Sequence, residues 1–502
     1  MSKILFINPG MNSNSGDKSW ESPMLRALQG KRTAYLPKLV GMILAALTPD
    51  KYTFEYLDES VESIDFGSDA DMVVITAMTA QACRAYQIAG EFRKRGKVVV
   101  IGGIHAAVMR EEVLAHCDVL MIGESENSWP VMLEDYENNR LKQVYDAKEY
   151  PPVENLISPR IDIIDPARYL CFPIQATRGC PYNCEFCSIE YSSGERYRMK
   201  PVSQVINEIL AYQEYDKKRG FAGIYEKGFY FVDDNLYVNR EYVKELLTAL
   251  IPLKIRWDGQ GTANMAKDDE VLQLLAESGC RTFSIGLESI VPESLQEMNK
   301  PKVNKIEEYK AMLSNIAKYG IVPGAYFVFG FDSDDIFVFR RTLAFIQESD
   351  VVEPIVSLLT PYPGTKLYER IKNRIYTTYN RSYNSGTCVY TPQNMTAGEL
   401  QAGMDWMGWK TSEFPFMKKQ LEKFWNYGPW KNTPFLTTRE RLLLICIALK
   451  LGFAGLWEYQ RFAFWVAFHR KAKDLKSIIW IMRRRELSMG QSGVLDPADS
   501  KI

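Results

Sequence analysis

Three cysteines in one short stretch are the residues of this chain most suited to chemistry. Cys180, Cys184 and Cys187 have C-x3-C-x2-C spacing and follow directly after the strand-like run 173–176. Cysteine thiolates are the usual ligands of iron–sulfur clusters, so these three can bind three irons of a cubic 4Fe–4S cluster. The fourth iron would then lack a protein ligand and would stay open to a small molecule.

A structural zinc ion is the main alternative for these thiolates. Structural zinc takes four ligands, usually in two closely spaced pairs, and the sequence offers no second pair here. The other cysteines are scattered along the chain and show no second cluster spacing: Cys83, Cys117, Cys171, Cys280, Cys388 and Cys446. We therefore expect one cluster and no auxiliary cluster.

The elements that must position these cysteines alternate between strand and helix over residues 171–370. The expected strands are 173–177, 228–232, 254–258, 281–285, 324–329 and 354–359. Helical patterns near 202–218, 239–250, 268–278, 304–319 and 336–348 fall between them. Such alternation favours a parallel sheet. Six repeats suit a partial (β/α)6 barrel, and barrel chemistry gathers at the carboxyl ends of the strands.

The order of strand, cysteine loop and helix closely resembles the radical S-adenosylmethionine (SAM) enzymes, whose fold is this partial barrel. By that resemblance the cluster passes one electron to SAM, which cleaves to methionine and a 5′-deoxyadenosyl radical. Phe186 stands at the family's aromatic position and is expected beside the adenine. Arg196 and Arg198, after the loop, can neutralise the cluster or a carboxylate, and solvated surface charge is the alternative.

The same resemblance implies SAM contacts at the ends of the second, third and fourth barrel strands. Asp233 and Asp234 occupy the slot of a Gly-Gly-Glu-like motif that holds the methionine amine, with a simple strand-end turn as the alternative. Gln260 ends the third strand. Gly286 and Glu288 fit the motif that approaches the adenosyl group, where Glu288 is either a ribose contact or a helix cap. No catalytic acid or base can be assigned.

Residues 1–140 show a second alternation of strands and helices. Strands are expected at 3–8, 54–57, 72–76, 98–101 and 119–122, and helices at 35–47, 80–95, 107–116 and 125–138. This pattern indicates a Rossmann-like (flavodoxin-like), doubly wound parallel sheet, which binds ligands beyond the carboxyl ends of its strands. No G-x-G-x-x-G follows the first strand, which argues against a dinucleotide.

The strand ends of this region resemble the cobalamin-binding domain that precedes the barrel in one radical SAM subfamily. The resemblance places these residues at cobalamin: Thr76, Met78, Gly102, Gly103, His105, Gly123 and Glu124. The glycine pair would let the corrin ring and its nucleotide tail approach the backbone. A flavodoxin-like domain used only for packing is the alternative.

One motif of many cobalamin proteins, the D-x-H-x-x-G that supplies a histidine to cobalt, is absent from the chain. We therefore expect His105 to line the ligand cleft without binding the metal, and a purely structural imidazole stays open. Cobalamin would then be bound with no protein histidine on its cobalt.

The remaining segments are a proline-containing linker at 141–170 and a mainly helical region at 371–502. Within the latter, residues 431–487 carry twelve Lys or Arg against four Asp or Glu. Their apolar runs stop short of the ~20 residues that a membrane-spanning helix needs. Interfacial helices on an anionic membrane, a helical lid over a greasy substrate and an ordinary packed subdomain all fit this pattern.

Length and charge narrow the remaining choices. A chain of 502 residues predicts two or three domains. A net charge of −1 gives no reason to expect a nucleic-acid partner. Because ligated thiolates need a reducing compartment and no signal-peptide pattern is apparent, we expect a cytoplasmic protein. Membrane association would depend on the basic segment.

The resemblance therefore predicts a cobalamin-dependent radical SAM enzyme, and in the first place a C-methyltransferase. Its substrate would be a lipophilic or pigment-like small molecule with an unactivated carbon, and its electron donor a flavodoxin or ferredoxin. A cyclase related to the anaerobic magnesium-protoporphyrin cyclase and a cobalamin-binding sensor are the alternatives. The intact cysteine triad argues against the sensor, because a sensor needs no open cluster.

The cysteine assignment predicts that anaerobically reconstituted protein binds about four irons. Cys180→Ala, Cys184→Ala and Cys187→Ala should each abolish SAM cleavage, measured as 5′-deoxyadenosine, because each removes a cluster ligand. Cys280→Ala is the control and should cleave SAM normally. Four irons in the triple variant would contradict the assignment.

Overall fold

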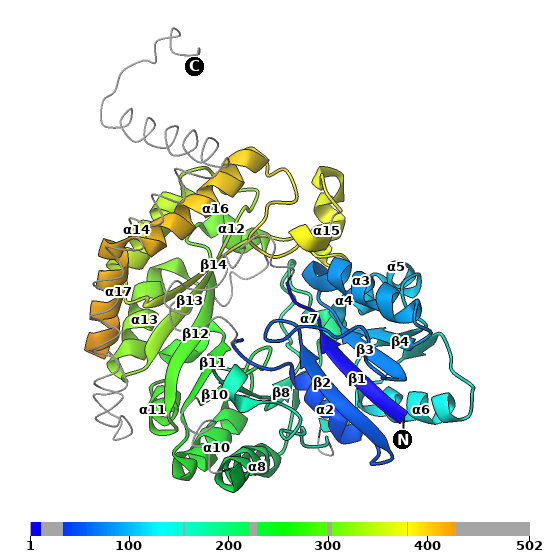
Figure 1. Cartoon of the computed structure of the whole chain (residues 1–502). Helices are drawn as coiled ribbons and strands as arrows, with labels where there is room; N and C mark the ends of the chain where they lie inside the picture. Colours follow the sequence, from blue (N-terminus) through cyan, green and yellow to red (C-terminus); the bar gives the residue numbers. More distant parts are fainter. Residues whose placement is uncertain are drawn as a thin grey trace.

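The computed structural model describes residues 2–11, 34–147, 149–153, 156–219, 228–298, 304–378 and 380–427. Over these residues the chain forms two α/β units side by side, each built on a six-stranded sheet (Figure 1). The basic segment 431–487 and Cys446 lie outside the described residues, so the expectations for them stay predictions.

The first sheet has the strand order β2-β1-β3-β4-β5-β6, and all neighbouring strands are parallel. Its strands are β1 (Ser2–Asn8), β2 (Tyr52–Asp58), β3 (Met72–Thr76), β4 (Val98–Gly102), β5 (Val119–Ile122) and β6 (Val144–Asp146). The order reverses between β1 and β3, which makes their carboxyl ends the usual ligand position of such a sheet. The doubly wound sheet expected from the sequence is therefore present.

Apolar side chains cover both faces of this sheet. The helices around it are α2 (Leu39–Leu47), α3 (Ala82–Arg93), α4 (Ile104–Val108), α5 (Arg110–Leu114) and α6 (Ser125–Glu137). One core lies under α3, α4 and α5, and a second lies under α2 and α6. Because both faces are buried, strands such as β3 read as continuous apolar runs rather than alternating ones.

The first sheet extends further than the sequence indicated. β6 falls inside the range 141–170 that was predicted as linker, and it pairs with β5. Only Tyr145 of this strand is buried, and its hydroxyl donates to Asp135 of α6 at 2.9 Å. A three-residue edge strand with one buried side chain carries too little hydrophobic pattern to be recognised from sequence.

The second sheet has the order β14-β13-β12-β11-β10-β7 and is again parallel throughout. Its strands are β7 (Phe172–Ile174), β10 (Phe229–Phe231), β11 (Trp257–Gly261), β12 (Cys280–Glu288), β13 (Val322–Phe329) and β14 (Glu353–Leu358). Its main helices are α8 (Val202–Arg219), α10 (Arg240–Leu250), α11 (Asp269–Glu277), α13 (Tyr309–Lys318) and α14 (Val338–Glu348). The sheet is open between β7 and β14, and the expected α/β class with parallel sheets is confirmed.

Polar residues start the helices that follow the strand ends. Asn239, Asp268, Thr365 and Thr396 each accept a hydrogen bond from the backbone N–H three residues on. Such N-caps contribute about 1 kcal/mol each. They begin α10, α11, α15 (Lys366–Ile371) and α16 (Ala397–Ser412), and α17 (Phe414–Tyr427) follows α16.

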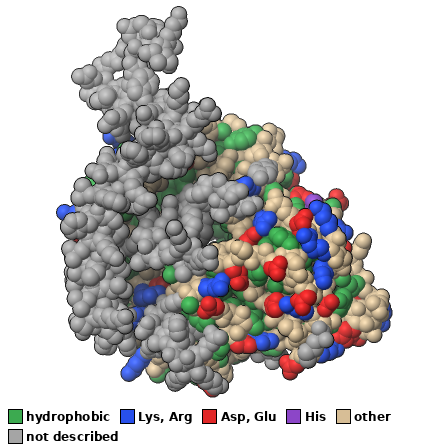
Figure 2. Space-filling view, viewed as in Figure 1, with side chains coloured by type: hydrophobic (Ala, Val, Ile, Leu, Met, Phe, Trp, Pro, Cys, Tyr) green, Lys and Arg blue, Asp and Glu red, His purple; other side chains and the backbone are tan. Residues whose placement is uncertain are grey.

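Charged side chains of both signs are intermixed over the described surface in Figure 2. Pairs such as Arg93 with Asp118, at 3.0 Å, are partly exposed and contribute at most about 1 kcal/mol. Among the described helices, none combines the length and the apolar character needed to cross a membrane.

Candidate functional site

The three cysteines lie on one loop, residues 179–197, whose two ends meet. β8 (Thr177–Arg178) leads into this loop and β9 (Arg198–Met199) leads out of it, and the two strands pair antiparallel. Gly179 has a φ of +83°, and a Cβ at this position would clash with the carbonyl oxygen of Arg196. Only glycine tolerates both the conformation and the close approach, so the entry into the loop is fixed by the backbone.

The thiols of Cys180, Cys184 and Cys187 are partly exposed on this loop. Among the described residues, no three His, Cys, Asp or Glu side chains surround a position for a single metal ion. A cubic cluster is larger than one ion, and three thiolates bind three different irons of it. The donor set and its partial exposure therefore fit an open-sided cluster better than a structural zinc ion.

The carboxylate of Asp233, at the end of β10, supports the strand that enters the loop. It is fully buried and accepts hydrogen bonds from the backbone N–H of Ala176, at 3.1 Å, and from the N–H and hydroxyl of Thr177. Burial raises the pKa of Asp233 to about 7, although these donors oppose the shift. The side chain thus fixes the backbone before the loop, and the predicted contact of Asp233 with SAM stays a prediction.

The next two residues continue this support into the loop itself. Asp234 accepts a hydrogen bond from the backbone N–H of Gly179 at 3.0 Å, and burial raises its pKa. The amide of Asn235, only 3% exposed, lies 3.9 Å from the sulfur of Cys180. The three consecutive side chains after β10 therefore contact three successive parts of the chain around the first cysteine.

Helix α15 holds the opposite side of the loop. The backbone N–H of Leu367 donates to the carbonyl of Glu185 at 2.9 Å. Arg370 forms two parallel hydrogen bonds of 2.8 Å with the Glu185 carboxylate, and Lys366 donates to Asn183. Paired N–H···O bonds of this kind fix orientation as well as distance, so the segment between the cysteines is held by a part of the chain about 180 residues away.

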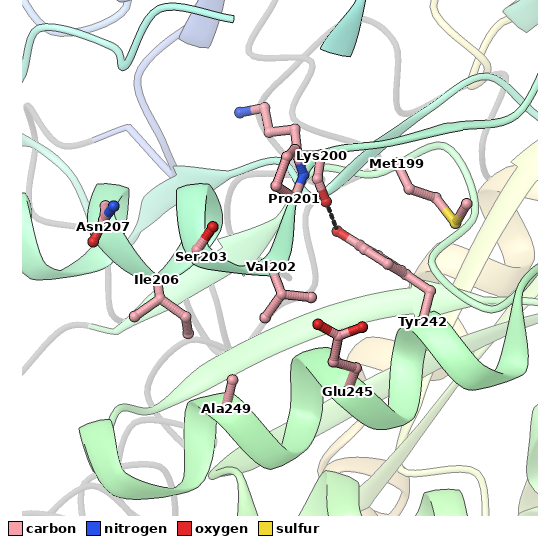
Figure 3. Close-up of a pocket in the computed structure, with 10 residues that line it drawn as sticks. All are labelled: Met199, Lys200, Pro201, Val202, Ser203, Ile206, Asn207, Tyr242, Glu245 and Ala249. Atoms are coloured by element: carbon pink, nitrogen blue, oxygen red, sulfur yellow. Dashed lines mark hydrogen bonds between the residues drawn. The ribbon is translucent and has the colours of Figure 1, made fainter. Parts of the chain in front are cut away.

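Tyr242 of α10 supports the base of the loop from outside the barrel. Its hydroxyl donates to the carbonyls of Lys200, at 2.7 Å, and of Ala176, at 3.2 Å. The ring forms one wall of a pocket of about 650 Å³ between α8 and α10 (Figure 3). Besides these two helices, the segment from Met199 to Pro201 lines this pocket. None of the three cysteines and none of the predicted SAM residues lines it, so we assign no catalytic role to it.

Two arginines at the base of the loop form a buried ion-pair cluster with the first unit. Arg178 contacts Glu124 and Glu126, both at 2.6 Å, and Arg198 binds the carboxylate of Glu124. These four side chains are only 7–10% exposed. Removing one partner from such a cluster costs about 3–5 kcal/mol, because a buried charge is left unpaired. Arg198 thus neutralises a carboxylate, one of the three roles left open for it, whereas Arg196 is exposed.

The other predicted SAM residues lie at the same end of the barrel. Gln260 donates to the carbonyl of Asp233 at 3.3 Å and accepts from the hydroxyl of Tyr326 at 2.6 Å. Glu288 is 8% exposed, and its φ of +64° is rare for a residue with a side chain. Gly286 stands two residues earlier, at a bulge of β12. Strained positions of this kind cluster at ligand sites, and the contact of Glu288 with the ribose of SAM stays a prediction.

Phe186 packs against the barrel core and is partly buried. The ring is therefore anchored beside the cysteine loop, where an adenine contact was predicted. The contact of Phe186 with the adenine of SAM stays a prediction.

The predicted cobalamin residues lie along the carboxyl ends of β3, β4 and β5. Thr76 is half-buried, whereas Met78 is 44% exposed. Gly103 has a φ of +98°, and a Cβ there would approach the backbone of Ala77 to 2.8 Å. Gly123 also has a positive φ, of +80°. Two of the three glycines are thus required by the local backbone, whether or not a ligand approaches them.

His105 is held inside the first unit and is only 1% exposed. One ring nitrogen lies 2.9 Å from the hydroxyl of Tyr86, and the other lies 3.3 Å from that of Thr79. Burial lowers the pKa of the imidazole. This burial and these two hydrogen bonds favour the structural role that the sequence left open, and a place for His105 beside cobalamin stays a prediction.

The sequence alone did not identify several residues that hold this site. Asn235 was part of a recognised strand end but had no role assigned. Glu126, Arg178 and Glu185 act through partners that are remote in the chain, and no local pattern indicates such pairs. The position of Arg178 directly before the glycine and first cysteine was the one available signal.

Substitutions at Gly102 and Gly103 should separate an effect on corrinoid binding from an effect on folding. A Cβ at Gly102 would lie 3.5 Å from the Met121 carbonyl oxygen, an ordinary contact. Gly102→Ala should therefore fold like the wild type but bind a corrinoid about tenfold more weakly, because the methyl group occupies ligand space. Gly103→Ala should lower the unfolding temperature of the apo-protein, because of its φ. Unchanged corrinoid affinity in Gly102→Val would contradict the predicted cobalamin edge.

Asp233 should give the apo-protein a distinct pH dependence. A raised pKa means that the folded state binds this proton more tightly than the unfolded chain, so stability from this group falls as pH rises from about 4 to about 7. Asp233→Asn should lose about 2 kcal/mol more stability at pH 5 than at pH 8, in urea unfolding. Asp335→Asn, at a carboxylate that is 48% exposed and paired with Arg341, is the control for the loss of an acidic side chain elsewhere in the fold. Equal losses at both pH values would contradict this account of Asp233.

Comparison with known proteins agrees with the site. A model described as the radical SAM superfamily matches residues 174–346. The bacteriochlorophyllide d C-12(1)-methyltransferase of Chlorobaculum tepidum is 34% identical over 370 residues, which cover 72% of this chain and 79% of that protein. The bacteriochlorophyllide d C-8(2)-methyltransferase of the same organism is 35% identical over 343 residues, covering 66% and 75%.

A solved structure shows the same fold. The cobalamin-dependent SAM radical enzyme OxsB, with aqua-cobalamin and SAM bound, aligns with a TM-score of 0.63 at 14% identity, over 96% of this chain and 75% of that one. The cofactors predicted from the sequence, a 4Fe–4S cluster, SAM and cobalamin, are those of this class of enzyme. The chain therefore belongs to the radical SAM methyltransferase family that includes these bacteriochlorophyllide methyltransferases.

Proposed function

We propose that this protein methylates an unactivated carbon of a pigment-like or lipophilic small molecule, with cobalamin as the methyl carrier. Two relatives of about one-third identity are named for the methylation of bacteriochlorophyllide d, which supports a pigment-like substrate. The observation that carries the proposal is the position of the cysteine loop beside the glycine-pair edge of the first sheet.

Two short helices bring these edges together. α4 begins directly after Gly102 and Gly103, and α7 (Ile189–Ser192) follows the last cysteine. The two helices pack against each other across the two units (Figure 1). The chain at Gly364 closes the same corner, because its backbone lies close to Val108 of α4 and its carbonyl accepts from the Tyr191 hydroxyl of α7 at 2.5 Å.

When bound, the cluster, SAM and cobalamin supply a substrate radical and a methyl donor, which is chemistry that no side chain provides. The residues of this chain fix where that chemistry occurs. Asp234 and Asn235 hold the loop from the barrel, Glu185 ties it to α15, and Arg178 ties it to the first unit. Reacting groups held in advance in this way lower the entropic cost of reaching the productive geometry.

Three parts of the proposal rest on the sequence alone. Reduced flavodoxin or ferredoxin is the proposed electron donor. The cytoplasm is the proposed location, and the basic segment 431–487 is the part proposed to contact a membrane or a greasy substrate.

Product stoichiometry tests the proposed reaction. Methylation by this route uses two SAM molecules, one as the radical source and one as the methyl source. Anaerobic turnover with a chlorophyllide-type pigment, followed by mass spectrometry, should give 5′-deoxyadenosine, S-adenosylhomocysteine and methylated product in equal amounts. Cys184→Ala is the control and should give no 5′-deoxyadenosine or methylated pigment. A modified pigment with 5′-deoxyadenosine but no S-adenosylhomocysteine would move the assignment to the cyclase alternative.

A further inference from the structure

We propose that Glu124 and Glu126 are positioning residues that clamp the first unit onto the base of the cysteine loop and so set how the cobalamin edge faces the cluster. This inference rests on the proposed function, and it gives Glu124 a different role from the cobalamin contact expected from the sequence. The interaction is between side chains of this chain, so it exists before any cofactor binds.

The first half of the clamp lies at the carboxyl edge of the first sheet. Glu124 and Glu126 follow β5 and Gly123, at the beginning of α6. Both carboxylates lie near the amino end of a helix, where negative charge is favoured. Their side chains are 8% and 10% exposed, so the pair is not a solvated surface feature.

The second half lies at the two ends of the cysteine loop. Arg178 on β8 and Arg198 on β9 are directly paired in the antiparallel ladder. Arg178 is two residues before Cys180 in the chain. A displacement of the glutamates would therefore move both ends of the loop together.

Each oxygen of the Glu124 carboxylate is used by this contact. One oxygen accepts from Arg198, and the other accepts from Arg178 at 2.6 Å and from Arg198 at 3.1 Å. Two parallel N–H···O bonds fix the relative orientation of the groups they join. A carboxylate engaged in this way is suited to align two units, whereas a ligand contact would need an oxygen directed at the ligand.

A third segment, at Tyr150 and Pro151, also contacts Arg198. The guanidinium of Arg198 lies 4.5 Å from the centre of the Tyr150 ring and donates to the carbonyl of Pro151 at 3.3 Å. It also donates to the carbonyl of Ser193, inside the loop, at 2.9 Å. The first unit, the segment predicted as linker (141–170) and the cysteine loop thus all contact the buried side chain of Arg198.

The charges explain why the arrangement acts as a unit. Two carboxylates face two guanidinium groups, so the buried cluster is balanced. Asp234 interacts electrostatically with both Glu124 and Arg178. The clamp is therefore coupled to the side chains that support the cysteine loop from the end of β10. Loss of one charge leaves another charge buried and unpaired. We therefore expect the loss of one glutamate to separate the two units at this contact, rather than only to lengthen one ion pair.

The test uses the full chain with cluster and corrinoid loaded, and compares Glu124→Gln with Glu62→Gln. Glu62 also bridges towards the second unit, through Arg168 at 3.2 Å, but that pair is 37–40% exposed and is a matched control. The magnetic coupling between the reduced cluster and cobalt(II) cobalamin should correspond to one narrow distance distribution in the wild type and in Glu62→Gln. In Glu124→Gln the distribution should broaden, while about four irons and one corrinoid remain bound.

A second measurement needs no cobalamin. Modification of arginines by phenylglyoxal, followed peptide by peptide, should be at least tenfold slower at Arg178 and Arg198 than at the exposed Arg196. Glu124→Gln should raise the rates at the two buried arginines about tenfold. If wild-type protein binds no corrinoid, the proposed function fails, and this measurement alone decides the clamp.

Two outcomes for Glu124→Gln would overturn the clamp. In the first, Glu124→Gln loses corrinoid but keeps the cluster and protected arginines, which would make Glu124 a cobalamin contact. In the second, both measurements match those of Glu62→Gln.

Where Glu124→Gln fails to fold, the double variant Glu124→Gln/Arg198→Gln removes the unpaired charge and keeps the pair of Glu126 with Arg178. It should load both cofactors and still show the broadened distance distribution, and a narrow one would also overturn the clamp.

Discussion

The structure depends on one constraint: a loop that offers three thiolates to a cluster must keep its shape without a fourth protein ligand. Its conformation is therefore determined from outside. Asp233, Asp234 and Asn235 support it from the end of β10, α15 holds it through Glu185, and Glu124 holds its base through two arginines. These contacts come from three regions of the chain, so the loop takes its final form only when both α/β units are folded and in contact.

The same contacts place unusual amounts of charge in the interior. A carboxylate removed from water must be compensated by donors or opposite charge. Asp233 is compensated by backbone N–H groups and a hydroxyl, whereas Glu124 and Glu126 are compensated by guanidinium groups. The first arrangement makes the entry of the loop sensitive to protonation. The second joins the two units at a point where apolar packing alone would not fix an orientation.

Local patterns predicted the elements well and their partners poorly. The six barrel strands and the doubly wound sheet follow from alternating apolar runs, and the cysteine spacing indicated the cluster. β6 was missed because one buried tyrosine gives no pattern. The enclosure of His105 by Thr79 on η2 (Thr79–Gln81) and Tyr86 on α3 was not indicated by the sequence, and its place at the ligand edge stays a prediction. Glu124, at the start of α6, and Arg178, on β8, are 54 residues apart, so only the folded chain brings them together.

Amide hydrogen exchange of the cysteine loop in the cofactor-free protein tests this account most directly, because it reports whether the loop is formed before the cluster binds. The account predicts protection of the backbone N–H groups whose hydrogen bonds hold the loop or its entry, namely those of Thr177, Gly179, Cys180 and Leu367. Their exchange should be slower by orders of magnitude than that of an unstructured peptide. Exchange of these amides at the rate of an unfolded chain would show that the cluster shapes the loop, and would contradict the account.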